Sequence, residues 1–259
     1  MKLKDTVHYN LYHNLFILFI VIICLLASVS ITDADFSSLF TNTKQMTSFL
    51  SRFLKPDFSY IPELIGPMFQ TLAMSVVGTV LGVLVAIPFS LLATTVVTDN
   101  KIITSIFRFL LGIIRTIPNL LLAALLVAII GIGEFTGVMT IAIFTFGMVS
   151  QLIYESIEII DYLPIEATYA VGANRIQMIF WAIFPQIIAS IISYSFYAFE
   201  VNVRASTVLG YVGAGGIGVI LNSSLALLQY ERVSMIILMI LLVVWLTDTV
   251  SEAIRKRVR

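Results

Sequence analysis

Long apolar segments are the feature that most constrains the fold of this chain. A helix needs roughly 20 mostly apolar residues to cross the hydrocarbon core of a bilayer. Six stretches approach that length, at about 15–31, 68–94, 117–132, 135–153, 186–206 and 233–250. The sequence therefore predicts an all-α integral membrane protein with about six transmembrane helices, five in a core and one at the N-terminus.

Composition supports a membrane location. Hydrophobic residues make up 59% of the chain and charged residues 12%, whereas soluble domains are about 45–50% apolar and about 25% charged. A soluble chain needs polar residues to cover its surface, so lipid must cover much of this one. The 15 basic and 15 acidic residues balance, which gives none of the basic field that nucleic-acid binding requires.

Basic residues in the connections predict the orientation of the spans. With six spans, three basic groups fall on one side: Lys2 and Lys4; Lys101, Arg108 and Arg115; and Arg255, Lys256, Arg257 and Arg259. We therefore expect both termini and the 158–185 segment in the cytoplasm, and the 207–232 segment outside. We treat residues 1–259 as one domain.

The first span, at about 15–31, has two interpretations. It is either an uncleaved anchor or a cleaved signal peptide, because Lys2 and Lys4 precede an apolar stretch that ends in small residues. The anchor is favoured because the apolar stretch is long. An extracytoplasmic loop is expected at about 32–67, and the core at about 68–255.

The segment between the fourth and fifth predicted spans contains polar residues scattered among apolar ones. Pro164 suits the first turn of a helix, and Gly172 suits the position after a helix end. Asn174 with Gln177 resembles a capping box, and Pro185 predicts a helix end before it. We predict two short helices joined at Gly172 and lying under the membrane.

The same segment carries a spaced motif. Glu166-Ala167-Thr168 is followed by Gly172 and then by Phe184-Pro185. This spacing resembles the EAA motif of ABC importer permeases, which reads Glu-Ala-Ala, three residues, Gly, nine residues, Ile, one residue, Leu-Pro. Thr168, Phe184 and Ala182 depart from that motif.

In the family that this segment resembles, the helix pair docks in a groove of the ATP-hydrolysing subunit. The resemblance therefore implies that four residues couple the chain to a separate ATPase: Glu166, Ala167, Gly172 and Pro185. The alternative is an amphipathic helix that rests on lipid.

A glycine-rich stretch follows the fifth predicted span. Gly213, Gly215 and Gly218 match G-x-G-x-x-G, but no strand or βαβ pattern surrounds them, so the match does not indicate nucleotide binding. No G-x-x-x-x-G-K-[ST] pattern occurs in the chain. ATP and Mg are therefore expected on a partner ATPase, and this chain is expected to hold no cofactor or metal and to be no enzyme itself.

The stretch from Phe199 to Gly218 resembles the signature of phosphonate-uptake permeases, a branch of the methionine-permease-like importers. The shared residues are Phe-Glu, an Asn, an Arg, Leu-Gly and Val-Gly-Ala-Gly-Gly-Ile-Gly. The resemblance covers roughly residues 68–255. It implies uptake of phosphonate or a related phosphorus oxyanion across the bacterial cytoplasmic membrane by a homodimer of this chain, with a pair of ATPase subunits and an extracytoplasmic solute-binding protein.

Other functions remain open at this point. A permease of the same fold for methionine, phosphate or another small solute is the nearest alternative. A secondary transporter driven by an ion gradient is a more distant one. A partner ATPase with a Walker motif would favour either kind of permease over the secondary transporter.

Charged residues near the end of the fifth span raise a further hypothesis. Glu200 and Arg204 are four apart and can pair on one helix face. A charge near mid-membrane costs roughly 2.5–3.5 kcal/mol on insertion scales, so such groups usually face a cavity or a partner. Arg204 and Asn202 are candidates to face the route of an anionic substrate, with Glu200 holding Arg204. A purely structural pair, with Arg204 snorkelling to the interface, is the equal alternative.

Glycines in the chain have two interpretations. Gly213, Gly215, Gly216 and Gly218 either permit close packing at an outer gate, which is favoured, or form an anion-binding nest. The G-x-x-x-G pair of Gly78 and Gly82 in the second span indicates helix packing, within the chain or between copies.

Overall fold

The computed structural model describes residues 11–32 and 41–258, and all regular structure in these residues is helical. The chain divides into two compact units, residues 1–51 and 52–259. In the first unit, α1 (Leu11–Ile31) is apolar, long enough to cross a membrane and exposed along its described side chains. The expected N-terminal span is thus a helix whose surface suits contact with lipid.

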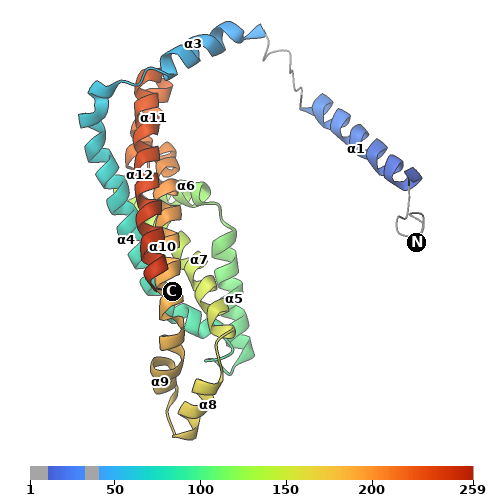
Figure 1. The fold of residues 1–259 in the computed structure, drawn as a ribbon, viewed down its shortest axis with the longest axis vertical. Helices are drawn as coiled ribbons and strands as arrows, with labels where there is room; N and C mark the ends of the chain where they lie inside the picture. Colours follow the sequence, from blue (N-terminus) through green and yellow to red (C-terminus); the bar gives the residue numbers. More distant parts are fainter. Residues whose placement is uncertain (1–10, 33–40, 259) are drawn as a thin grey trace, which may run out of the picture. The chain divides into compact units, whose positions relative to one another are not determined.

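The second unit is a bundle of helices (Figure 1). Its helices are α4 (Ile61–Ala93), α5 (Lys101–Thr116), α6 (Asn119–Ile130), α7 (Glu134–Glu158), α8 (Leu163–Ala170), α9 (Arg175–Met178), α10 (Phe184–Leu209), α11 (Ile217–Ala226) and α12 (Tyr230–Val258). The turn η2 (Phe58–Tyr60) precedes α4, η3 (Ile179–Ile183) lies between α9 and α10, and η4 (Gly210–Val212) lies between α10 and α11. The helix α3 (Thr43–Phe53) begins in the first unit and ends in the second, so the expected 32–67 loop contains helical structure.

The helices confirm the predicted membrane fold. Five helical stretches are long and apolar enough to cross a membrane: 12–31, 58–93, 134–158, 175–212 and 230–258. A sixth span is counted when α5 and α6 are taken together, although the two helices meet at 90°.

The third predicted span, at 117–132, contains a helix of 12 residues that is too short to count as a span by itself. Its residues form α6 and the bend before it, and the expected connection with Lys101, Arg108 and Arg115 is itself the helix α5. Pro118 accounts for the break, because a proline disfavours helical geometry in the residue before it. Ile117 accordingly has extended backbone angles, with ψ at 119°.

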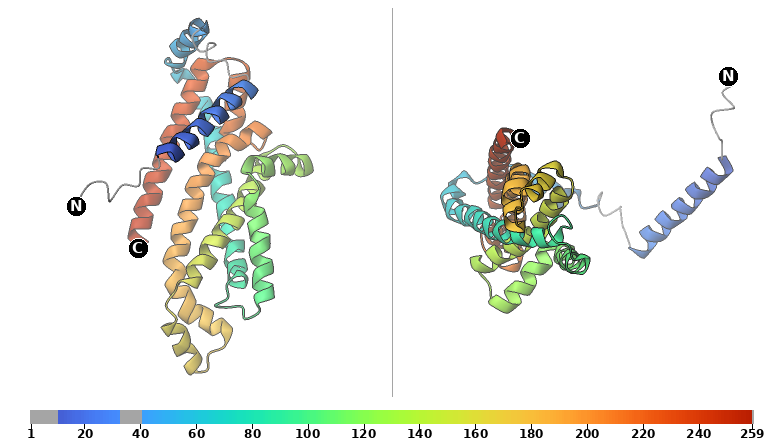
Figure 2. Two further views of the ribbon diagram at one scale, coloured as in Figure 1. Left: turned by 90° about the vertical axis from the view of Figure 1, so that its right-hand side faces the viewer. Right: turned by 90° about the horizontal axis from the view of Figure 1, so that it is seen from below.

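Helices α8 and α9 lie at one end of the bundle and α11 lies at the other (Figures 1 and 2). We call these the α8–α9 end and the α11 end. Between them α4, α7, α10 and α12 run side by side, while α6 projects at a steep angle to α5.

Glycines allow α4 and α7 to pack closely. A Cβ atom at Gly78 would lie 2.6 Å from Ile141 Cγ2, and one at Gly82 would lie 2.6 Å from Thr145 Cβ. The G-x-x-x-G pair of α4 therefore serves packing within this chain.

Candidate functional site

The α8–α9 hairpin has the local structure that its sequence predicts. Pro164 lies in the first turn of α8, and Gly172 has a φ of +81°. The N–H of Ala173 donates to the carbonyl of Thr168 at 3.0 Å and that of Gly172 to Tyr169 at 2.9 Å, which together form a Schellman motif. Backbone and side-chain bonds thus set the angle between the two helices.

The start of α9 is also fixed by side chains. Asn174 accepts a hydrogen bond from the Gln177 N–H at 2.9 Å, and the Gln177 side chain accepts one from the Asn174 N–H at 2.9 Å. This reciprocal capping box is the one that the sequence predicts. The hairpin is therefore a stiff element and not a loose loop.

The hairpin has one anchored face and one free face. Ile165 and Met178 are buried in a core cluster with Ile153 and Ile157 of α7. Glu166, Ala167, Gly172 and Pro185, the predicted coupling residues, are all exposed. Large apolar side chains beside them are exposed as well, namely Leu163, Tyr169, Val171, Ile176, Phe180 and Trp181. An apolar face on a rigid support is suited to docking a protein partner.

Pro185 does not end a helix, contrary to expectation. It lies in the first turn of α10, directly after the π-helical turn η3. The helical path runs on from Arg175 to Val212, because the wider π turn accommodates the residue that lacks an N–H. As a result α9 and α10 are one continuous element.

Gln186 ties the start of α10 to the α7–α8 connection. Its Nε2 donates to the carbonyl of Asp161 at 3.2 Å and to that of Ala182 at 2.8 Å, and its Oε1 accepts from the Asp161 N–H at 3.1 Å. Both ends of the hairpin are thereby attached to the bundle.

Glu200 and Arg204 form the predicted pair and belong to a larger network. Arg204 Nη2 lies 2.6 Å from Glu200 Oε1 and 2.7 Å from Asp248 Oδ2 of α12, and Arg255 Nη2 lies 3.1 Å from Glu200 Oε2. The two positive charges of this network, on arginines, equal the two negative charges, on carboxylates. This favours the structural reading, because an incoming anion would have to displace a carboxylate from Arg204.

Neither Asp248 nor the pairing of Arg255 with Glu200 was identified from the sequence. Asp248 is a lone acid in the sixth predicted span, and this is the signal that could have found it. Its partner on another helix has no fixed sequence spacing, so the pairing itself requires the structure.

Asn202 does not face a route through this chain, and that expectation is corrected. Its side chain is fully buried. The Nδ2 atom donates to Thr79 Oγ1 of α4 at 2.8 Å and to Thr145 Oγ1 of α7 at 2.7 Å. Its Oδ1 has no hydrogen-bond partner among the described residues. Asn202 therefore joins α4, α7 and α10, since it lies on the face of α10 that packs inward.

The glycine-rich stretch is a break between α10 and α11 that packs against other helices. Gly213, Gly215 and Gly216 have φ values of +84°, +89° and +72°. A Cβ atom at Gly216 would lie 2.5 Å from Thr71 Oγ1, and one at Gly218 would lie 2.1 Å from a carbonyl oxygen. These close approaches support the packing interpretation over the anion nest.

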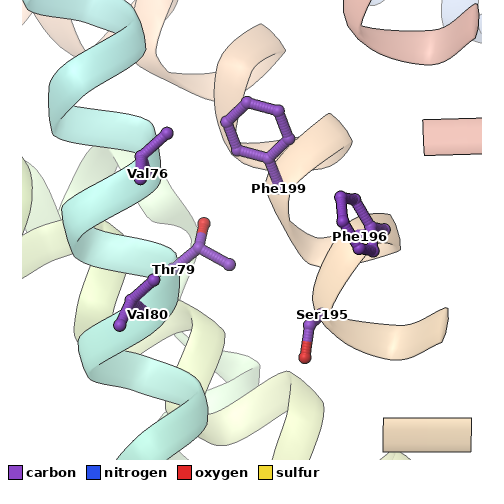
Figure 3. A pocket seen from close by; sticks show the side chains of 6 residues that line it. All are labelled: Val76, Thr79, Val80, Ser195, Phe196 and Phe199. Carbon is purple, nitrogen blue, oxygen red and sulfur yellow. The ribbon is translucent and has the colours of Figure 1, made fainter. Parts of the chain in front are cut away.

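The second unit has a hollow beside α4 and α10 and another beside the glycine-rich stretch. An apolar groove of 280 Å³ opens between α4 and α10 and is lined by Val76, Thr79, Val80, Ser195, Phe196 and Phe199 (Figure 3). A hollow of 420 Å³ adjoins the glycine stretch, where Gln70 and Glu134 supply polar side chains. Within residues 11–32 and 41–258, no three His, Cys, Asp or Glu residues are placed to hold a metal ion.

Comparison with known proteins agrees with this geometry. Residues 78–259 match the family model described as binding-protein-dependent transport system inner membrane component. The phosphite transport system permease protein PtxC of Stutzerimonas stutzeri is 35% identical over 90% of this chain and 85% of its own length. The phosphate-import permease protein PhnE of Mycolicibacterium smegmatis is 33% identical over 85% of this chain and 42% of its own length.

Solved structures show the same fold. A chain of the inward-facing MetNI methionine ABC transporter superposes with a TM-score of 0.68 at 20% identity, covering 78% of this chain and 99% of that one. A chain of a bacterial ABC transporter involved in alginate import gives 0.63 at 16% identity, covering 96% and 99%. The chain therefore belongs to the family of binding-protein-dependent transport system inner membrane components.

Proposed function

We propose that this chain is the membrane-spanning permease subunit of an ATP-driven importer for phosphonate or a related phosphorus oxyanion. The observation that carries the proposal is the α8–α9 hairpin, which is anchored in the core through Ile165 and Met178 and exposes an apolar face. Such a face on a rigid support can receive movement from a partner and pass it to the bundle.

The substrate class is supported by the relatives. They are named for phosphite and phosphate transport, and a further relative from Escherichia coli is named for phosphonate transport. All three solutes are oxyanions of phosphorus, so we propose that class for this chain.

The proposed assembly follows from the family and the hairpin. Two copies of this chain form the transmembrane path, a pair of ATPase subunits holds ATP and Mg at the α8–α9 end, and a solute-binding protein docks at the α11 end. The α8–α9 end and both termini then lie in the cytoplasm of a bacterial cell, in agreement with the basic residues of the tail.

The test is uptake of labelled phosphite and labelled methylphosphonate in cells that lack this gene, with and without the restored protein. We expect uptake to return with the wild type and to fail with Gly172→Asp, which places a carboxylate beside the apolar face. Gly172→Asn is the matched control, because Asn has the same size, tolerates the same φ and carries no charge. Co-purification of the ATPase with each variant separates lost docking from lost insertion.

Each outcome has a distinct meaning. Uptake that is independent of the protein, with the ATPase still bound, would reject the phosphorus oxyanion and direct the search to other small solutes. Failure of the wild type to bind any ATPase would reject the importer itself.

A further inference from the structure

An ion pair connects the α8–α9 hairpin to a second part of the bundle. Arg175, the first residue of α9, pairs with Asp99 in the turn of residues 94–100, which we call the α4–α5 turn. Arg175 Nη1 also donates to the Val97 carbonyl at 3.4 Å. The α4–α5 turn lies far from the hairpin in sequence, so this ion pair is a tertiary contact at the α8–α9 end of the bundle.

The α4–α5 turn is rigidly joined to α5. Asn100 caps that helix, since its Oδ1 accepts from the N–H groups of Ile102 at 2.9 Å and Ile103 at 3.4 Å. Val96 and Val97 of the turn pack on the same core cluster that holds the hairpin. A displacement of α9 therefore acts on α5 through both polar and apolar contacts.

Arg108 attaches the middle of α5 to neighbouring helices. Its Nε donates to the Ala93 carbonyl at the end of α4 at 2.8 Å, and its guanidinium pairs with Glu158 at the end of α7. The guanidinium also lies over the Tyr154 ring, 5.1 Å from the centroid. Arg108 thus joins the middle of α5 to the C-terminal ends of α4 and α7.

The other end of this path reaches the glycine stretch. Beyond the bend at Pro118, α6 leads to Ile132 and Gly133. The Gly133 N–H donates to the Gly213 carbonyl at 3.0 Å, and a Cβ atom at Gly213 would lie 3.2 Å from Ile132. Residues 101–133, which we call the α5–α6 arm, therefore lead from the α4–α5 turn, through the bend at Pro118, to the break between α10 and α11.

We propose that Asp99 and Arg175 are positioning residues for coupled transport. Their ion pair fixes the hairpin to the α4–α5 turn, so that movement of α9 passes through the α5–α6 arm to the glycine stretch at Gly213. This inference rests on the proposed function, because the movement of α9 is the one that a docked ATPase would impose. A contiguous set of contacts of this kind is the physical route by which distant sites are coupled.

The pair is suited to a test because the fold does not depend on it. The side chains of Arg175 and Asp99 are 57% and 76% exposed, and exposed pairs contribute little to stability. We therefore expect charge-reversal variants to insert and assemble normally. The expected loss of coupling is about fivefold, which corresponds to about 1 kcal/mol, the upper range for such pairs.

The experiment uses the complete complex with its ATPase and binding protein in proteoliposomes. The variants are Asp99→Arg, Arg175→Asp and the double exchange. The readout is labelled phosphite transported per ATP hydrolysed, which a purely structural role in assembly would not change. We expect each single variant to lower this ratio about fivefold and the double exchange to restore it. The control is Lys256→Glu, which reverses an equally exposed pair with Glu252 that lies within α12 alone.

A second readout follows the arm directly. Ile129 on α6 is 79% exposed. The variant Ile129→Cys, made together with Cys24→Ser, can be labelled at this position with an environment-sensitive fluorophore. ATP is expected to change its emission in the wild type, to do so weakly in each single variant, and to do so fully in the double exchange. An ATP response that all the variants retain overturns the inference and leaves the importer standing. A wild-type complex that binds no ATPase overturns the importer instead.

Discussion

The close contact between α4 and α7 provides a quantitative test of the fold. At Gly82 an added Cβ atom would lie 2.6 Å from Thr145 Cβ and 2.7 Å from the Ala142 carbonyl oxygen. At Gly112 in the interior of α5, nothing lies within 4 Å of the added atom. Both sites are helical and receive the same substitution, and they differ in what the new methyl group meets.

The expected effects have opposite signs. Replacing a helical glycine by alanine gains roughly 0.5–1 kcal/mol, because alanine loses less backbone entropy on folding. Gly112→Ala should show this gain alone. At Gly82 the methyl group overpacks the interface, which costs about 1–3 kcal/mol in well-packed cores. Gly82→Ala should therefore be less stable relative to wild type than Gly112→Ala by about 1–3 kcal/mol.

The measurement is the thermal unfolding midpoint of each purified variant in the same detergent. For a chain of this size, 1 kcal/mol shifts the midpoint by roughly 2–4 °C, so the two variants should differ by about 2–12 °C. A Gly82→Ala midpoint equal to or above that of Gly112→Ala would refute the packing of α4 on α7.

Three other predictions concern buried and charged residues. Asn202→Ala should lower the free energy of unfolding by about 1–3 kcal/mol, since two buried hydrogen bonds are lost; a midpoint unchanged from wild type would contradict the buried site. Arg204→Gln should leave Asp248 unpaired and lower transport and stability together, while Arg204→Gln with Asp248→Asn should recover both. Recovery of stability without transport would instead assign Arg204 to the anion route. Gly216→Ala should destabilise more than Gly172→Ala, because both need positive φ but only Gly216 has a neighbour in the way; equal midpoints would argue against that packing.

Local patterns in the sequence were enough to predict the α8–α9 hairpin. Pro164, Gly172 and the Asn174–Gln177 capping box act within one turn of the residues they influence. The Glu200–Arg204 pair is also local, since residues four apart in a helix share a face. The membrane-spanning character of the chain followed from apolar segments longer than a soluble core requires.

Tertiary contacts decided the remaining features. A periodic pattern does not reveal which helix lies opposite another, so the links of Asp248 and Arg255 to α10 and the burial of Asn202 came only from the structure. The same holds for the bend at Pro118, where a proline permits a kink, while α5 and α6 each pack against α7 and meet at 90°. Sequence determines what each segment can form by itself, while the packing of distant segments selects which faces are buried, because burial free energy depends on the neighbour and not on the segment alone.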